Sequence, residues 1–473
     1  MENPTLDKGR FMILIAGGSL VGLSLALALE SAGIDYELFE KGDFAPQLGA
    51  SIGLHPHALR ILDQLGLRQD LERAVVPLRD RLHYDGHGHC FEESHVLAEI
   101  NKILRRPIIF MERSEALKIL HDHIQDKSRL HASNGVVGYK ETTDGVLVAT
   151  QDGTTHHGHI LVGADGIHSR VRQLMAERIG KEDPELAMEL IQGFTSEYNC
   201  IFGASNNRKS SFLPNGVVHN VYYYQFSAVA AAGVDGLVFW FLFVKAGTMS
   251  RTPNCPRFNE ADAEALIEEY GDAHVGPGYT IRDLWEARVK ATMVPLEEGV
   301  LKQWSHNRVV LMGDAVHKAT INPGLGGNLA IEGIAHFTNV LVPLLKEHPI
   351  PSLEQLAGAF QEYHVRQRPR ADAIVSMSGR ITQYEAQETW LYKFAAQHVI
   401  PLVSDSVKAH AYAKFSNSSP WLEYLPLPAL DAGLAQQIIG GSEHPQKRWS
   451  FSLLPALGVL VAAAGVAYRM RSK

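Results

Sequence analysis

Cysteine is scarce in this sequence. Only Cys90, Cys200 and Cys255 occur in 473 residues, far apart and with no CxxC pair among them. A disulfide framework and a thiolate-only metal site both need cysteines in paired or clustered spacing, so both are excluded. We therefore expect the protein to work in a reducing compartment.

An excess of positive charge is also absent. The chain has 44 Lys and Arg against 52 Asp and Glu, a net charge of −8, which argues against nucleic acid as the main partner. With 45% hydrophobic and 20% charged residues, the composition is that of an ordinary enzyme rather than a disordered or multi-span membrane protein. The length suits two or three lobes that share a large core.

Long hydrophobic runs are rare, and two segments alone are apolar enough to suggest a membrane. Residues 12–29 are interrupted by Gly17, Gly18, Ser19 and Gly22 and lack a clear cleavage site, although a signal peptide stays an alternative. Residues 451–468 carry no charge over 18 positions and are flanked by basic residues on both sides. At about 1.5 Å per residue, a helix of this length just crosses a bilayer. We expect a C-terminal anchor, with a buried terminal helix as the alternative.

Residues 11–40 predict a strand, a helix and a second strand in succession. "FMILI" at 11–15 is a short apolar run, "LVGLSLALALESA" at 20–32 is rich in helix formers, and "YELFE" at 36–40 follows Gly33. Gly17 permits a tight turn, Gly22 permits close packing of helix on strand, and the helix N-terminus faces a pyrophosphate. Ser19 stands where a second glycine is usual, and Glu40 ends the second strand in position to bond a ribose. The pattern predicts a dinucleotide site.

Two later stretches complete a family resemblance. "GHILVGADGIHSRVRQ" at 158–173 contains Asp165-Gly166, and residues 308–341 contain Gly313-Asp314 before a Pro-Gly-rich loop and a helix. The glycine-rich turn, the Asp-Gly pair and the Gly-Asp pair occur in this order along the chain. In these motifs and their order, the sequence resembles single-component flavin-dependent monooxygenases of the para-hydroxybenzoate-hydroxylase type. Within that group, nearly the whole chain resembles the fungal FAD-dependent epoxidases of meroterpenoid and indole-diterpene pathways. His57 and residues 319–321 depart from that pattern.

The resemblance implies roles for individual residues around FAD. Glu40 would bind the adenosine ribose, and Asp314 the ribityl chain or the ribose nearer the flavin. Arg113 would touch the cofactor, while Asp165 and Gly166 would serve the flavin pyrophosphate and the approach of NADPH.

Three glycines complete the implied cofactor set. Gly53 falls in a second flavin-contacting loop, and Gly326 and Gly327 lie in the 324–328 segment that would face the isoalloxazine. Taken alone, the acidic residues of the set also suit turns, helix caps or a solvated strand end, and the arginine suits an ordinary surface charge.

No second dinucleotide fingerprint is present in the sequence. Members of the family that it resembles have no separate NADPH domain. In them, NADPH binds transiently over the flavin as the reductant, and O2 is the co-substrate. The implied chemistry is oxygen insertion from a flavin C4a-hydroperoxide.

The resemblance implies an α/β fold, in which a Rossmann-type FAD-binding domain carries an inserted β-sheet substrate domain, with a C-terminal transmembrane helix. We expect the FAD-binding domain at residues 10–180 and 296–390, the second part including a packing helix. The β-rich substrate domain takes 181–295, a membrane-proximal segment 391–445 and the transmembrane helix 449–468.

Tyrosines of the middle region are the candidate catalytic residues. Tyr222 and, as a weaker candidate, Tyr224 are expected on one face of a strand, where the resemblance makes Tyr222 a substrate-side proton donor. An aromatic row that packs the sheet is the alternative. The histidine-rich segment 83–95 is weighed as a zinc site, but its alternation of histidine with glycine suits a hairpin turn, and we expect no metal.

The predicted function is NADPH-consuming epoxidation of a prenyl double bond in a meroterpenoid-like or related terpenoid intermediate. The alternatives are hydroxylation of a phenolic or polyketide ring, with Arg208 as the visible carboxylate partner, and a non-oxygenating flavoprotein scaffold or redox sensor. The expected partners are a lipophilic small molecule, a membrane and a downstream terpene cyclase. The expected location is the endoplasmic reticulum membrane with the catalytic part in the cytosol.

Overall fold

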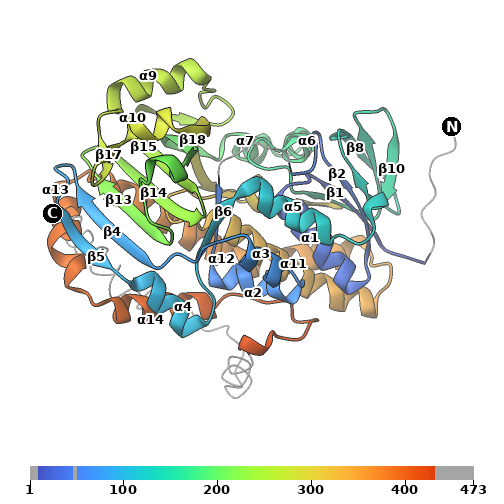
Figure 1. The fold of residues 1–473 in the computed structure, drawn as a ribbon. Helices are drawn as coiled ribbons and strands as arrows, with labels where there is room; N and C mark the ends of the chain where they lie inside the picture. The colour runs from blue at the N-terminus through green and yellow to red at the C-terminus, as the bar shows by residue number, and fades with distance from the viewer. Residues whose placement is uncertain (1–8, 46–50, 432–473) are drawn as a thin grey trace, which may run out of the picture.

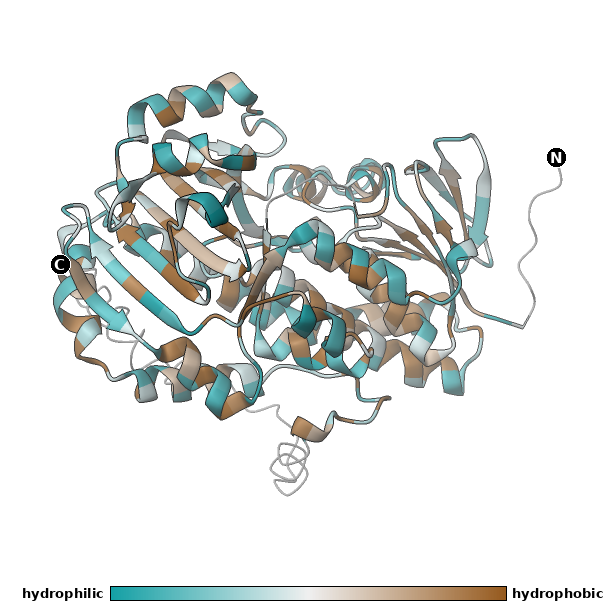
Figure 2. Ribbon diagram, viewed as in Figure 1, coloured by the Kyte–Doolittle hydropathy of each residue, from teal (hydrophilic) through white to brown (hydrophobic). Residues whose placement is uncertain are grey.

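The computed structural model of the protein describes residues 9–45 and 51–431, and two large sheets dominate them. Figure 1 shows the six-stranded sheet at the right and the eight-stranded sheet at the left, with the long helices α11 and α12 behind and below. Figure 2 shows apolar residues along the central strands of the six-stranded sheet, whose side chains belong to the largest buried core.

The six-stranded sheet has the order β19-β20-β11-β1-β2-β7. β1 (Met12–Ala16) pairs in parallel with β2 (Asp35–Phe39) and with β11 (Ile160–Gly163), and β11 pairs in parallel with β20 (Val309–Leu311). α1 (Leu20–Ala32) connects β1 to β2 and ends at Gly33 in the left-handed conformation. The predicted strand–helix–strand unit is therefore confirmed, with ends that differ by at most one residue. The outer strands are β7 (Leu130–His131) and β19 (Ser305–His306).

The eight-stranded sheet has the order β21-β18-β12-β15-β14-β13-β4-β5. Its centre consists of β12 (Thr195–Asn206), β15 (Leu237–Arg251), β14 (Phe226–Val234) and β13 (Val217–Tyr222). β4 (Asp80–Asp85) and β5 (Cys90–Ser94), which the sequence places within the first FAD-binding segment, join this sheet by parallel pairing of β4 with β13. The other edge has β18 (Arg288–Val300) and β21 (His317–Lys318). The sheet thus draws its strands from separate parts of the chain.

Smaller elements complete the described residues. The remaining strands are β3 (Ser51–Leu54), β6 (Ile109–Glu112), β8 (Val136–Glu141), β9 (Val146–Thr150), β10 (Thr155–Gly158), β16 (His274–Gly276) and β17 (Tyr279–Thr280). The helices up to the eight-stranded sheet are α2 (Pro56–Gln64), α3 (Arg68–Arg73), α4 (Val96–Leu104), α5 (Arg113–His123), α6 (Arg170–Ile179), α7 (Pro184–Gln192) and α8 (Asn207–Ser210). Later helices are α9 (Glu260–Tyr270), α10 (Ile281–Glu286), α11 (Gly326–Glu347), α12 (Leu353–Glu385), α13 (Trp390–Phe394) and α14 (Asp405–Asn417).

One described helix is long and apolar enough to cross a membrane by length and composition. It is α11, and 78% of its most apolar window is buried inside the protein. It packs against α1 and α12 as a core helix. The C-terminal span predicted at 449–468, and the part of the membrane-proximal segment beyond residue 431, lie outside the described residues.

Candidate functional site

The turn between β1 and α1 is built by two glycines. Gly17 has φ +103°, and a Cβ there would lie 2.5 Å from the carbonyl oxygen of Ala164. A Cβ at Gly22 would lie 1.8 Å from the carbonyl oxygen of Gly17, so the first turn of α1 packs directly on this turn. Both positions are closed to any side chain, as the sequence pattern requires of a nucleotide-binding turn.

The N-termini of α1 and α11 converge beside this turn. A Cβ at Gly327 would lie 2.9 Å from Leu20 Cδ2, and one at Gly313 would lie 2.7 Å from Val21 Cγ2. Neither helix has a side-chain cap or an acidic residue in its first turn. Two helix N-termini with uncapped N–H groups therefore face the same region, and both dipoles favour a bound anion there.

Arg113, Ser19 and Asp314 meet at the same place. Arg113 begins α5 and donates a hydrogen bond from Nη2 to Ser19 Oγ over 2.8 Å. Burial lowers the pKa of Arg113, and the nearby Asp314 carboxylate opposes this shift. Asp314 keeps 33% of its side chain accessible although burial is the largest influence on its pKa, which the Lys318 ammonium lowers overall. We call the region where these side chains and the two helix N-termini come together the recess.

Glu40 lies at the end of β2, where the sequence pattern expects it. Its two carboxylate oxygens accept hydrogen bonds from Gly18 N at 2.6 Å and from Gly42 N at 3.0 Å. A carboxylate has about four acceptor positions, so each oxygen keeps one for a ribose hydroxyl.

Asp165 uses its carboxylate inside the protein. It accepts hydrogen bonds from the backbone N–H groups of Arg170 and Val171 at 2.7 and 3.1 Å, and it caps α6 together with Ser169. Asp165 also lies against the nucleotide-binding turn, because its Cα would be 2.7 Å from a Cβ at Gly17. Gly166 follows with φ +79°. The structure thus places this pair at the recess, with the carboxylate committed to shaping the backbone.

The loop before α11 is held by two residues that the sequence pattern did not single out. Asn328 donates from Nδ2 to the carbonyl oxygens of Gly53 and Gly324 at 2.9 and 2.7 Å, and accepts from His55 N at 2.8 Å. The His55 ring is buried against this loop and is held by Tyr412 at 2.7 Å. Asn328 therefore clamps β3, with Gly53, to the loop before Gly326 and Gly327. The only sequence signal for this role of Asn328 is its position directly after the pair Gly326-Gly327.

The residues around the recess fit FAD. Two uncapped helix ends and a guanidinium suit a diphosphate, and two partly accessible carboxylates suit ribose and ribityl hydroxyls. Gly17 and Gly22 let the first turn of α1 pack directly on the ends of β1 and β11, because a Cβ at either position would overlap backbone atoms there. Glu40, Arg113, Asp314 and the 324–328 backbone would hold the cofactor.

One face of the eight-stranded sheet is turned toward this loop, and we call it the loop-facing face. Tyr198, Cys200, Phe241 and Phe243 are buried on it, and Ile321 of the loop belongs to the same apolar cluster. The cluster also has partly accessible members, which are Phe110, Phe202, Val229 and Val294. The face is aromatic and apolar next to the loop that precedes α11.

Tyr222 and Tyr224 do not share a strand face. Tyr222 is the last residue of β13; it is buried, and its hydroxyl lies 3.0 Å from His83 Nδ1. Tyr224 lies beyond the strand and is 67% exposed. The predicted alternation is therefore wrong at Tyr224, because β13 ends at Tyr222.

The histidine-rich segment is dispersed by the β4–β5 hairpin. His83 faces Tyr222, His87 and His89 lie in the turn around Asp85, and His95 pairs with Asp80 at 2.8 Å. The Arg208 side chain is 73% exposed and pairs with the exposed Asp235.

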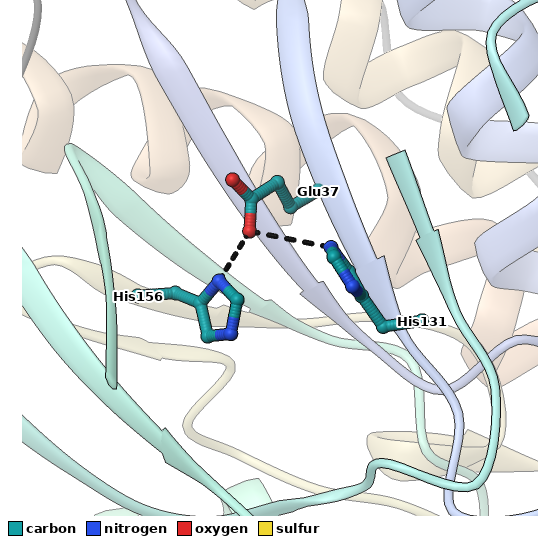
Figure 3. Close-up of side chains that lie close together, drawn as sticks. All are labelled: Glu37, His131 and His156. Atoms are coloured by element: carbon teal, nitrogen blue, oxygen red, sulfur yellow. Dashed lines mark hydrogen bonds and ion pairs between the residues drawn. The ribbon is translucent and has the colours of Figure 1, made fainter. Parts of the chain in front are cut away.

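Among the described residues, one group of three side chains has metal-ligand atoms within 4.8 Å of one another: Glu37, His131 and His156. Figure 3 shows both imidazoles turned toward one oxygen of Glu37, at 2.5 Å for His156 Nδ1 and 3.4 Å for His131 Nε2. The hydrogen bond from His156 lowers the pKa of Glu37. The hydrogen bond from His156 and the approach of His131 to Glu37 join β2 and β7 to β10.

The chain matches a family model described as an FAD binding domain over residues 10–233 and 250–378. Similar curated proteins include the FAD-dependent monooxygenase penM of Penicillium crustosum, 34% identical over 90% of this chain and 89% of its own length. The FAD-dependent monooxygenase ptmM of Penicillium ochrochloron is 35% identical over 85% of this chain and 96% of its own. The FAD-dependent monooxygenase paxM of Penicillium paxilli is 31% identical over 98% and 96%.

Solved structures with the same fold contain FAD. HpxO from Klebsiella pneumoniae, complexed with FAD and uric acid, superposes with a TM-score of 0.69 at 19% identity and covers 89% of this chain and 100% of its own. CtdE in complex with FAD and a substrate superposes with a TM-score of 0.65 at 16% identity, covering 86% and 98%. At these identities the likeness concerns the fold alone.

Proposed function

The chain belongs to the FAD-binding family, among the fungal FAD-dependent monooxygenases, and from this premise we propose that it epoxidises a prenyl double bond. The substrate would be a meroterpenoid-like or related terpenoid intermediate of secondary metabolism. NADPH, a proton, O2 and the alkene give the epoxide, water and NADP+. One oxygen atom of O2 enters the alkene, and the other leaves as water.

The observation that carries this proposal is the apolar loop-facing face. Phe110, Phe202, Val229 and Ile321 are partly accessible there, next to the loop before α11. A prenyl chain is a hydrocarbon, so burial against these side chains favours its binding by roughly 25 cal/mol per Å². An alkene also needs no base to activate it, whereas a phenol does.

Bound FAD supplies the two-electron chemistry that lets O2 react. The protein contributes geometry and exclusion of water. Asn328 fixes the loop against β3, and the aromatic side chains of the loop-facing face keep water away. Tyr222 would hold a proton at its Oη, because burial raises its pKa well above the usual value and the hydroxyl stays protonated.

We also propose that residues 451–468 anchor the protein in the endoplasmic reticulum membrane, with the catalytic part in the cytosol. The 18-residue charge-free run between basic flanks supports this. A polyprenyl substrate partitions into bilayers, and a downstream terpene cyclase would use the epoxide. Truncation after Pro445 tests the anchor: the full chain should sediment with membranes and the truncated chain should not. Persistent sedimentation of the truncated chain would contradict it.

The test of the reaction is the anaerobic rate of flavin reduction by NADPH, with and without candidate substrates. We expect a farnesylated methyl hydroxybenzoate to accelerate reduction and small phenolic acids not to do so. Turnover with isotopically labelled O2 should then give a product with one labelled oxygen in an oxirane. Acceleration by phenolic acids alone, with a labelled ring hydroxyl, would support the hydroxylase instead. Reduction that no compound changes, without oxygenated product, would support the non-oxygenating flavoprotein.

A further inference from the structure

A charged pair lies at one end of the loop-facing face. Arg81 of β4 donates from Nε to Asn220 Oδ1 of β13 over 2.8 Å, and its Nη2 lies 3.8 Å from Glu385 Oε1. Glu385 is the last residue of α12 and also accepts from Asn220 Nδ2 at 3.3 Å. Three elements therefore meet at one guanidinium and one carboxylate.

The pair is tied to the loop before α11. Asn322 donates from Nδ2 to Glu385 Oε2 over 2.7 Å, and Asn322 stands directly before Pro323 and Gly324. On the sheet, Arg81 is in register with Val218, which clusters with Val229 and Phe110 of the loop-facing face. The pair is thus beside the apolar surface proposed for the prenyl chain and beside the loop that would contact the flavin.

The two partners differ in accessibility. The Arg81 side chain is 31% accessible, while that of Glu385 is 3% accessible. The Nε–H of Arg81 donates to Asn220. Within the described residues, the terminal N–H groups of Arg81 make no hydrogen bond, and Nη2 only approaches Glu385 at 3.8 Å. Arginine has five N–H donors in a planar fork, so donors remain for an incoming oxygen.

Charge decides which oxygen binds there. Glu385 accepts hydrogen bonds from Asn220 and Asn322. Burial raises the pKa of Glu385, whereas the Arg81 guanidinium and the hydrogen bond from Asn322 oppose this shift and favour the carboxylate that balances Arg81. The neighbouring His83 adds no positive charge, because burial lowers its pKa well below the usual value. Farther out, Glu92 is paired with Lys408. A second carboxylate at Arg81 would be repelled by Glu385 in a poorly solvated place, whereas a carbonyl oxygen meets only the donors.

We propose that Arg81, balanced by Glu385 and oriented by Asn220, binds a carbonyl oxygen on an uncharged ring of the substrate. The prenyl chain then extends along the loop-facing face. This inference rests on the proposed function and names its substrate class: neutral, carbonyl-bearing rings with a long hydrocarbon tail. It also assigns Glu385 the task of rejecting the corresponding carboxylic acids.

Equilibrium binding tests the inference without turnover. The FAD absorbance of the oxidised holoenzyme is titrated at pH 8, without NADPH, with three probes: a farnesylated methyl hydroxybenzoate, its free acid, and a farnesylated phenol that lacks the carbonyl. The wild type should bind the ester about tenfold more tightly than the acid. Arg81→Met should weaken ester binding by about tenfold and leave the carbonyl-free phenol unchanged, since one charge-assisted hydrogen bond is lost.

Glu385→Gln is the sharper variant, because it preserves shape and removes the balancing charge. It should strengthen binding of the free acid by about tenfold and change ester binding little. Arg208→Met and Asp235→Asn form the matched control, an exposed arginine–carboxylate pair outside the recess, and should change nothing. FAD content and the melting temperature of each variant report on folding, and Arg81→Lys gives a second, charge-preserving test.

The inference is overturned by equal wild-type affinity for ester and acid, by an Arg81→Met variant that keeps full ester affinity, or by an unchanged preference in Glu385→Gln. The anaerobic reduction assay reports on the proposed function separately. If the ester accelerates flavin reduction but binds equally well to the wild type and to Arg81→Met, this inference fails and the epoxidase proposal stands. If no farnesylated probe binds or accelerates reduction, both fail.

Discussion

Ser19 stands where nucleotide-binding turns usually carry a second glycine, and its hydroxyl accepts a hydrogen bond from Arg113. The serine therefore does more than take the place of a glycine, because it orients a guanidinium beside two uncapped helix ends. Arg113 adds a full positive charge where a diphosphate would bind. The serine that replaces the usual glycine is thus accompanied by a hydrogen bond from Arg113 of α5, a helix distant in the sequence.

Arg113→Met should weaken FAD binding by about tenfold to a hundredfold, the effect of losing one charged contact to a phosphate. Fluorescence titration of the apoprotein with FAD measures this. Lys118→Met, an exposed change on the same helix, is the control and should leave affinity unchanged. Full FAD affinity in Arg113→Met would remove Arg113 from the cofactor site. Ser19→Gly should have a smaller effect than Arg113→Met, because it frees the guanidinium without deleting it.

Tyr222 allows a second prediction for a single residue. Its hydroxyl lies 3.0 Å from His83 Nδ1, at the edge of the loop-facing face. Tyr222→Phe should lower kcat by about tenfold to a hundredfold, the usual size of a proton-transfer contribution, with FAD affinity unchanged. Tyr224→Phe, at an exposed position, should have no effect. If kcat and its pH profile are the same in Tyr222→Phe and the wild type, Tyr222 is a packing residue.

At the scale of secondary-structure elements, Asn328 of α11 makes three hydrogen bonds to backbone groups: to Gly53 of β3, to His55 directly after β3, and to Gly324 of the loop before α11. Asn328→Ala leaves these backbone groups unpaired and should reduce the free energy of unfolding by roughly 2–4 kcal/mol. It should also weaken FAD binding, because the loop loses its support.

Asn339 provides a matched control for this prediction. It is a buried asparagine on the same helix, and it bonds to the backbone of Trp421 and Glu423, away from the recess. Asn339→Ala should reduce the free energy of unfolding by a similar amount and leave FAD affinity unchanged. Denaturant titration of the apoprotein and FAD titration separate the two effects. Equal loss of FAD affinity in both variants would show that Asn328 acts only through general stability.

The strand–helix–strand unit is predictable because its signals are local. Gly17, Gly22 and Glu40 lie within one unit whose hydrophobic pattern and glycines specify its ends. β4 and β5 give no such signal, since β4 pairs with a strand 137 positions later, as in Asp80 with Val217. Arg81 and Glu385 are 304 positions apart, and nothing local to either residue predicts their contact. The sequence pattern identifies the nucleotide-binding turn, whereas the charged pair at the end of the loop-facing face depends on tertiary pairing.

The histidines give the whole molecule a pH response. His55, His159, His219 and His317 are buried in different parts of the chain. Burial lowers the pKa of each to about 4. His219 and His317 lie in the eight-stranded sheet, His159 directly precedes β11 of the six-stranded sheet, and His55 lies beside the α11 loop, so their protonation acts on the fold rather than on one site.

Stability should therefore fall as pH decreases below about 6.5, because each histidine binds a proton readily when unfolded and resists it when folded. At pH 5.5 each such histidine costs roughly 1.4 kcal/mol, so four cost on the order of 5 kcal/mol, a large share of the stability of an ordinary protein. Glu298 acts in the opposite sense, since burial raises its pKa to about 7 and its protonation favours the folded state. Burial also raises the pKa of Asp165, Glu189 and Glu385. The histidines with a lowered pKa outnumber these carboxyl groups, since burial also lowers the pKa of His57, His83 and His336, so the net direction is a loss. Denaturant unfolding of the holoenzyme at several pH values between 7.5 and 5 measures how the free energy of unfolding changes on both sides of the onset. A free energy of unfolding that stays level across this range would mean that these histidines are protonated in the folded protein, and hence that the polar groups around them, not burial, set their pKa values.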